Sequence, residues 1–193
     1  YIVSSSTLSS EYRLLPADEP EGDFRIFQER GDDYEYRVYH GGDRFYVLTN
    51  YGAENFRLME TPLTRTGRRH WKVRIPHRTD VLLQGAEVFT DYLVLNERKN
   101  GLVQLRVIHR PSEKEYYIEF DEEAYYAGIS VNEVMDTGDL RFVYTSMTTP
   151  FSTYRYDMES KERELLKMEK VLGGFDPDDY RTERIYAEAD DGT

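Results

Sequence analysis

A strand–turn–strand unit recurs along this chain at intervals of 44, 47 and 50 residues. The first strands of its four copies start at Tyr1, Phe45, Tyr92 and Phe142. The second strands start at Tyr12, Phe56, Val103 and Thr153, which gives the same three intervals. In the copy at residues 45–60 the side chains alternate as in a pleated strand, and Gly52 allows a tight turn. A period of about 40–50 residues with several strands per repeat is typical of β-propeller blades.

The repeat predicts an all-β fold, a partial β-propeller of roughly four antiparallel four-stranded blades. We place the blades at about residues 1–30, 34–76, 80–120 and 124–168. The first blade lacks its first strand, and its other strands are expected at 1–6, 10–15 and 24–29. Those of the second are expected at 35–40, 44–50, 55–60 and 71–75. Those of the third are expected at 80–89, 92–98, 102–109 and 115–120, and those of the fourth at 125–131, 140–147, 152–158 and 163–167.

Glycine, asparagine and proline mark the expected turns. Gly41-Gly42 and Asn100-Gly101 each predict a hairpin, and Pro150 interrupts the central hairpin of the last blade. Residues 158–172 are rich in helix-forming Glu, Lys and Leu, but the repeat favours a strand there because tertiary context often overrides propensity. We therefore expect one domain at 1–174, followed by a crossover segment at 175–193 with one more strand at 183–189. The chain starts inside a strand and ends on a turn signal, so we expect a piece of a longer protein.

Composition limits the classes of partner. The formal net charge of −12 disfavours nucleic acid, which needs a basic surface, and agrees with solubility or with steering of cationic ligands. The absence of cysteine excludes disulfides and cysteine-based zinc sites. No apolar run is long enough to span a membrane, and the N-terminus does not resemble a signal peptide. We expect a cytoplasmic protein, with the periplasm as the alternative.

The sequence predicts no catalytic, cofactor-binding or metal-binding residue in this chain. The histidines, which form no zinc-ligand pattern, are His40, His70, His77 and His109. Serines cluster at 4–6 and 9–10 without the Gly-x-Ser-x-Gly elbow, and the Asp-Asp pairs at 32–33, 178–179 and 190–191 lack the spacing of a calcium loop.

Two features leave alternatives open. Trp71 is expected to pack between blades, with a ligand-stacking platform as the alternative. The connection at 61–70 is basic, with Arg65, Arg68 and Arg69. This cluster fits a solvated loop, or a surface that docks an acidic partner.

Residues 144–150, Tyr-x-Ser-Met-Thr-Thr-Pro, followed by Tyr-Arg-Tyr-Asp at 154–157, are the most specific motif of the chain. This motif resembles the propellers of oligopeptidase B (protease II) enzymes, a branch of the prolyl oligopeptidase family of serine peptidases. The likeness extends through residues 9–15, 44–50, 55–58, 89–94, 101–102 and 180–181, and the segment 185–193 resembles the family's crossover into its hydrolase domain.

The resemblance implies a two-domain peptidase that cuts short peptides after Lys or Arg. This chain would form the C-terminal part of a seven-bladed propeller that restricts access by size. The catalytic Ser, Asp and His would lie beyond Thr193, so none is assigned here. The implied partners are the hydrolase domain of the same chain and short basic peptides, and unpaired blade edges at residues 1–6 and in the last blade would favour self-association.

The blade repeat by itself also allows a protein-interaction scaffold, because fold does not determine function. A scaffold of the common repeat type should show Gly-His and Trp-Asp dipeptides in its blades, and this sequence has neither. A third alternative is a propeller enzyme with its site in the central channel. Such a site needs clustered histidines or metal-binding carboxylates, which the sequence does not show.

Overall fold

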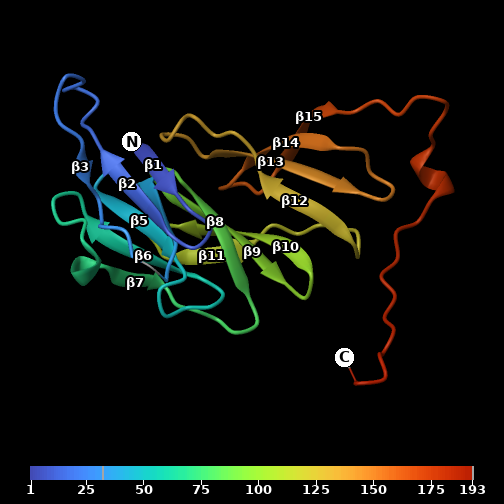
Figure 1. Cartoon of the computed structure of the whole chain (residues 1–193). Helices are drawn as coiled ribbons and strands as arrows, with labels where there is room; N and C mark the ends of the chain where they lie inside the picture. The colour runs from blue at the N-terminus through green and yellow to red at the C-terminus, as the bar shows by residue number, and fades with distance from the viewer. Residues whose placement is uncertain (32, 193) are drawn as a thin grey trace.

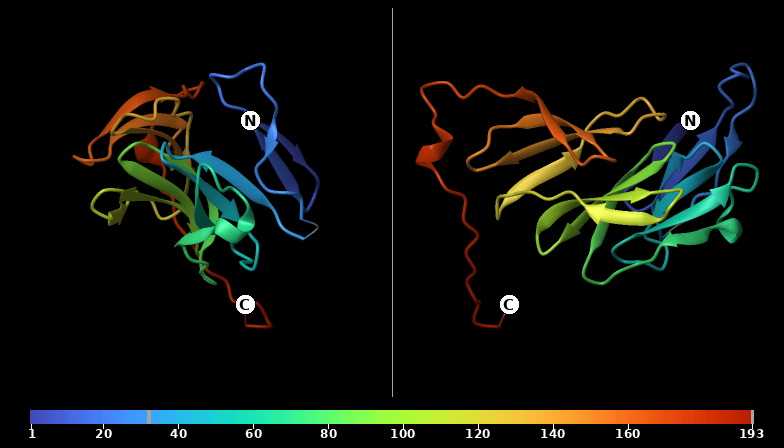
Figure 2. Two further views of the ribbon diagram at one scale, coloured as in Figure 1. Left: turned by 90° about the vertical axis from the view of Figure 1, so that its left-hand side faces the viewer. Right: turned by 180° about the vertical axis from the view of Figure 1, so that it is seen from behind.

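The computed structural model describes residues 1–31 and 33–192, and its regular structure is almost entirely β-strand. Within those residues the strands form four antiparallel sheets, which fan out one after another along the chain (Figures 1 and 2). The only helices in the described part are two short 3-10 turns, η1 at Arg68–His70 and η2 at Pro177–Asp179. The predicted β-propeller blades are therefore confirmed. Asp32, in one of the predicted Asp-Asp pairs, lies outside the described residues.

Each sheet is one blade, and its strands follow one another in chain order. Blade 1 has three strands, β1 (Ile2–Ser5), β2 (Ser10–Leu14) and β3 (Arg25–Ile26). Blade 2 has four, β4 (Tyr36–His40), β5 (Arg44–Thr49), β6 (Arg57–Pro62) and β7 (Lys72–Ile75). Blade 3 consists of β8 (Leu82–Val88), β9 (Tyr92–Lys99), β10 (Leu102–His109) and β11 (Lys114–Tyr117). Blade 4 consists of β12 (Tyr125–Ile129), β13 (Asp139–Ser146), β14 (Ser152–Asp157) and β15 (Arg163–Met168).

The predicted turn residues lie where the backbone needs them. Asn100 and Gly101 both have positive φ, 51° and 79°, as the tight turn between β9 and β10 requires. Gly52 has φ 57° in the turn between β5 and β6. Pro150 separates β13 from β14, because it cannot donate a backbone hydrogen bond to the ladder.

The core lies between neighbouring blades. Three buried apolar clusters fill the spaces between blades 1 and 2, 2 and 3, and 3 and 4. Trp71 belongs to the first of these clusters, with its ring centroid 5.7 Å from that of Tyr36 and its indole N–H donating to the Thr66 carbonyl. Trp71 is therefore a core residue, and the alternative of an exposed ligand-stacking platform is wrong.

The segment after blade 4 departs from one prediction. Residues 183–189 were expected to form a strand, but the structure shows no regular element there. Their alternating pattern has no adjacent strand edge to pair with among the described residues, and Ile185 and Tyr186 are more than 80% exposed. The helix-prone run at 158–172 does contain a strand, β15, as the repeat predicted.

Strand direction divides the loops between two opposite faces of the fan. Antiparallel hairpins alternate between the faces, so the second hairpin of each blade lies beside the connection to the next blade. Asn55, in the second hairpin of blade 2, shows this contact directly, because its side-chain amide donates to the carbonyls of Arg78 and Thr79 in the connection. We call this side the crossover face, defined by the turns at 50–56, 100–101 and 147–151 and the connections at 76–81 and 118–124. The chain leaves β15 at this face of blade 4 (Figure 2).

Candidate functional site

One carboxylate on the crossover face accepts hydrogen bonds from hydroxyl groups of two other segments of the chain, β13 with the turn that follows it and the segment after blade 4. Glu122 accepts hydrogen bonds from Tyr144 Oη at 2.5 Å, from Ser146 Oγ at 2.6 Å and from Thr149 Oγ1 at 3.0 Å. Thr148 Oγ1 also donates to it. The fifth hydroxyl, Thr182 Oγ1, lies 3.4 Å from Oε1 of Glu122. We call Glu122 with these five hydroxyl residues the Glu122 anchor.

The local sequence explains how this arrangement forms. Glu122 lies in the connection that leads from β11 into β12, directly beside the turn between β13 and β14. Ser146 shapes that turn, because its Oγ accepts the backbone N–H groups of Thr148 and Thr149 at 3.0 and 2.8 Å. Pro150 then ends the turn, so the hydroxyls of Ser146, Thr148 and Thr149 point to one place. The Ser-Met-Thr-Thr-Pro motif is therefore a hydroxyl-lined turn built around a carboxylate.

The hydrogen bonds determine the charge state of Glu122. Burial by itself would raise the pKa of this carboxyl, but the hydroxyls of Ser146, Thr148, Tyr144 and Thr149 outweigh it and lower the pKa from 4.5 to about 2. Burial, together with the bond to the Glu122 carboxylate, raises the pKa of Tyr144. Glu122 is thus a carboxylate at neutral pH, and its lone pairs are occupied. Such a group suits holding chain segments together and not proton transfer.

The segment after blade 4 is attached at this site and at its neighbour. Thr182 contacts both Glu122 and Thr148 Oγ1, the latter at 3.2 Å. The Arg184 backbone N–H donates to the Glu123 carboxylate at 3.3 Å, and its guanidinium donates to the Asn100 carbonyl of blade 3. The crossover segment therefore runs across the ends of blades 4 and 3 and is fixed to both.

A second buried carboxylate lies on blade 3. The Glu97 side chain is fully buried and contacts the guanidinium groups of Arg78 and Arg106, with the Tyr117 hydroxyl donating to it at 2.8 Å. Arg78 belongs to the connection between blades 2 and 3, so this cluster fixes that connection as the Glu122 anchor fixes the next. Sequence reasoning missed both carboxylates. The one available signal for Glu122 was the acidic run at 121–123, placed by the repeat on the same face as the Thr-rich turn.

Among the residues considered for chemistry, the hydroxyls of Ser6 and Ser9 lie 2.9 Å apart, and Arg30 donates to the hydroxyls of Ser4 and Ser9. The described residues contain no group of three or more His, Cys, Asp or Glu side chains arranged to hold a metal ion. His109 Nδ1 pairs with Ser112 Oγ at 2.7 Å on blade 3, while Ser10 is buried against Tyr36 between blades 1 and 2. Neither serine is beside a histidine and a carboxylate in a nucleophile–base–orienter arrangement.

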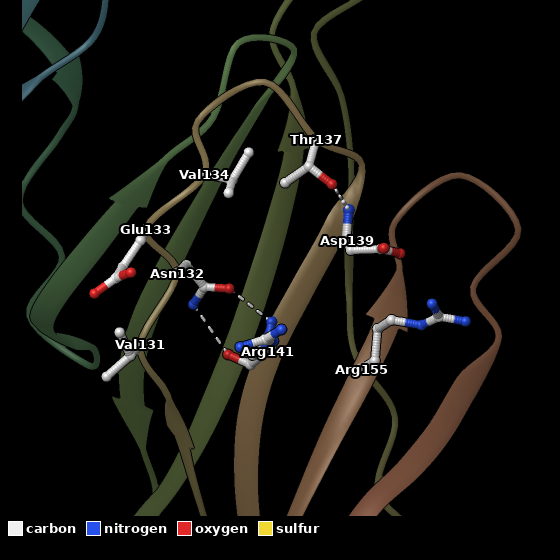
Figure 3. A pocket seen from close by; sticks show the side chains of 8 residues that line it. All are labelled: Val131, Asn132, Glu133, Val134, Thr137, Asp139, Arg141 and Arg155. Atoms are coloured by element: carbon white, nitrogen blue, oxygen red, sulfur yellow. Dashed lines mark hydrogen bonds between the residues drawn. The ribbon is translucent and has the colours of Figure 1, made fainter.

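A pocket of about 580 Å³ opens on the opposite face, between the β12–β13 connection and the ends of β13 and β14 (Figure 3). Asn132 shapes its wall, donating to the Arg141 carbonyl and accepting the Arg141 N–H at 3.1 and 2.7 Å. Val131 and Val134 are exposed at its rim, and Arg155 is paired with Glu164. The lining contains no nucleophile–base pair, so this pocket does not define a reaction.

No helix in the described part of the chain is long and apolar enough to cross a membrane. The fan of blades, with a segment after the last blade fixed to its crossover face, defines a β-propeller module. The sequence profile of the prolyl oligopeptidase N-terminal β-propeller domain matches residues 1–169. The chain therefore belongs to the prolyl oligopeptidase family and forms part of its propeller domain.

Similarity to individual proteins supports the same family assignment. The chain is 43% identical over 192 residues to dipeptidyl aminopeptidase BI of Pseudoxanthomonas mexicana, covering 99% of this chain and 26% of that protein. It is 30% identical to protease 2 of Moraxella lacunata, with coverages of 97% and 26%. Among solved structures, it is similar to oligopeptidase B from Trypanosoma brucei with covalently bound antipain, with 32% identity, a TM-score of 0.85 and coverages of 99% and 28%. The chain spans about a quarter of the length of these relatives.

Proposed function

We propose that this chain is the non-catalytic propeller part of a serine oligopeptidase that cleaves short peptides after Lys or Arg. The main support is the similarity to the Trypanosoma brucei oligopeptidase B structure over 99% of the chain. The lack of a nucleophile–base arrangement among the described residues agrees with a role outside the chemistry. The catalytic residues then belong to a hydrolase domain of the same protein, which is this module's partner.

The proposed role of the module is to restrict which substrates reach that domain. Blades packed through continuous apolar clusters make a stiff wall, since close-packed interiors deform little. The crossover segment at 175–193 leads from this wall toward the hydrolase domain in our proposal. The Glu122 anchor would then fix the direction in which the two domains face each other.

Charge supports the substrate class. The chain has a formal net charge of −12, and an acidic surface raises the local concentration of cationic peptides. The attraction between exposed charges is screened by salt. We therefore expect the acidic surface to raise the rate at which cationic peptides encounter the protein, and we expect this rate to fall as the ionic strength rises.

The 43% identity to a dipeptidyl aminopeptidase supports a second candidate. In that case the whole protein would remove dipeptides from free N-termini instead of cutting within a peptide. Both candidates are serine peptidase functions with the same propeller role. The family membership favours either of them over the interaction scaffold considered from the repeat alone.

Blocked and unblocked substrates separate the two candidates. The full-length protein that contains these residues should be given an N-terminally acylated Arg-Arg coumarin amide and the same compound with a free amine. The proposal predicts that the acylated compound is cleaved after arginine. It also predicts that short peptides with one arginine are cleaved, whereas a folded protein that contains the same site is not. Turnover of the free-amine compound alone would favour the aminopeptidase, and equal cleavage of folded protein would contradict access restriction.

A further inference from the structure

The basic connection at 61–70 forms a distinct surface on the rim of the fan. It includes η1, which lies at the outer edge of blade 2 beside β7, away from blade 4 and the C-terminal segment (Figure 1). Two contacts attach it to blade 1. The Arg68 N–H donates to Gln28 Oε1 at 2.6 Å, and the Arg25 guanidinium donates to the Leu63 carbonyl at 3.3 Å. The loop therefore has a fixed position between blades 1 and 2.

Aromatic side chains hold the central arginine of this loop in place. The Arg68 guanidinium carbon lies 4.1 Å from the centroid of the Tyr51 ring and 5.2 Å from that of Tyr34. The two rings contact each other edge-on at 5.3 Å. Stacking over the ring faces leaves the edge of the guanidinium, with its N–H donors, available to a ligand.

The charge of this surface is not neutralised within the described chain. Arg65, Arg68 and Arg69 are exposed, and none has a carboxylate within ion-pair distance among the described residues. By contrast, nine other arginines have such a partner: Arg13, Arg44, Arg74, Arg78, Arg106, Arg110, Arg155, Arg163 and Arg181. In a chain with a net charge of −12, a patch of three unpaired guanidinium groups is a local reversal of sign.

These arginines line one open depression of about 930 Å³ between blades 1 and 2. Among the described residues, its lining includes a single carboxylate, Glu29, and the polar groups of Gln28, Thr64 and Thr66. The depression lies outside the short outer strand β3 and beside β7, so the packing of blade on blade does not cover it. Its size suits several residues of an extended chain better than one small anion.

We propose that this depression binds an acidic segment of a partner polypeptide, whose carboxylates pair with Arg65, Arg68 and Arg69. Guanidinium groups bind carboxylates through two parallel hydrogen bonds, and the stacked Arg68 is already oriented for this. A long nucleic acid has the same sign of charge, but it would extend beyond the patch onto a surface that is acidic overall. A short acidic segment contacts only the patch itself.

The proposal is tested with the full-length protein and a fluorescein-labelled decaglutamate peptide, by fluorescence anisotropy at low and physiological salt. We expect saturable binding that weakens with salt. The triple variant Arg65→Ser, Arg68→Ser, Arg69→Ser should bind about tenfold more weakly, since each exposed pair contributes modestly. A control triple, Lys114→Ser, Lys167→Ser, Lys170→Ser, removes the same charge from exposed positions on blade 3, on β15 and directly after β15, and should bind as the wild type does.

Three outcomes would overturn the proposal. The first is that decaglutamate does not bind to the wild-type protein. The second is that both triple variants lose the same affinity, which would mean that only the overall charge matters. The third is that a single-stranded oligonucleotide of equal charge binds more tightly than decaglutamate and depends on the same arginines. Retained turnover of a small coumarin substrate by each variant confirms that it is folded.

Discussion

Thr182 hydrogen-bonds to Glu122, a residue 60 positions earlier in the chain, with the hydroxyl oxygen 3.4 Å from Oε1 of the carboxylate. The same carboxylate accepts the hydroxyls of the turn between β13 and β14. One side chain therefore connects the entry into the last blade, the central hairpin of that blade and the segment that leaves it. This arrangement gives the Ser-Met-Thr-Thr-Pro motif a physical role.

Replacing Glu122 by glutamine should lower stability at neutral pH. The amide cannot accept all the hydroxyls, and hydrogen bonds to a charged group contribute about 2 kcal/mol. For a domain of this size, that corresponds to a melting temperature lower by about 4–8 °C. Differential scanning calorimetry of the full-length protein measures the shift. The control is Glu119→Gln, an exposed carboxylate in the same connection, which should melt with the wild type.

The Glu122 anchor also predicts that the stability of the protein depends on pH in the acid range. The pKa of Glu122 is lowered from 4.5 to about 2 in the folded protein, so its stabilisation is fully present above about pH 4.5. It is lost as the pH falls from there toward 2, because the unfolded chain then binds the proton more tightly. The difference in melting temperature between wild type and Glu122→Gln should therefore shrink across this range. A difference that stays constant down to pH 2 would contradict the assignment.

Removing the attachments of the crossover segment should loosen it without unfolding the blades. The double variant Thr182→Val, Arg184→Ala loses the hydroxyl contact to Glu122 and the guanidinium contact to Asn100. Hydrogen–deuterium exchange should become faster at residues 175–190 and stay unchanged in β13 and β14. Glu188→Ala, an exposed change in the same segment, is the control. If exchange at residues 175–190 is as slow in the double variant as in the wild type and in Glu188→Ala, these contacts do not hold the segment.

Among the charged residues, Glu97 should be one of those whose replacement lowers the stability of the protein most. Changing it to glutamine leaves Arg106 and Arg78 without a buried counter-charge, and removing one partner of a buried pair costs about 3–5 kcal/mol. Glu115→Gln, which removes an exposed partner of Arg106, should cost less than about 1 kcal/mol. Thermal unfolding compares the two. Equal effects would mean that the burial of Glu97 is energetically unimportant.

Exposed sheet edges predict association when residues 1–193 are produced alone. β15 is an edge strand, and Leu165, Leu166 and Met168 are each about half exposed. Unpaired edges with apolar side chains invite pairing between chains. Light scattering should show species larger than a monomer. The fraction of these species should fall in the Leu165→Lys variant but not in the control Leu172→Lys, which lies outside the strand. A strictly monomeric chain at high concentration would exclude this association.

The blades were predictable because their signals are local. Alternating side chains, the Asn100-Gly101 turn and the similar spacings of Phe45, Tyr92 and Phe142, 47 and 50 residues, each describe a few neighbouring residues or a simple repeat. These signals also identified β15 in spite of its helix-prone composition. The same alternation misled at residues 183–189, because a strand needs a partner edge and the pattern alone does not supply one.

The Glu122 anchor was not predictable in the same way. Its hydroxyls come from positions 144 to 149 and from 182, and nothing in the sequence pairs them with a glutamate in an ordinary acidic run. The resemblance singled out the Thr-rich motif without explaining it. The basic loop was noticed from composition, but the stacking of Arg68 on Tyr51 and the lack of carboxylate partners depend on how blades 1 and 2 meet.

We propose that this propeller shapes access while the chemistry lies in another part of the protein. The most direct measurement is to label the full-length protein with a serine-reactive fluorophosphonate and map the modified residue by mass spectrometry of its peptides. The account predicts one labelled serine, outside residues 1–193, with labelling that abolishes cleavage after arginine. Labelling of a serine within these residues, with loss of activity, would contradict it.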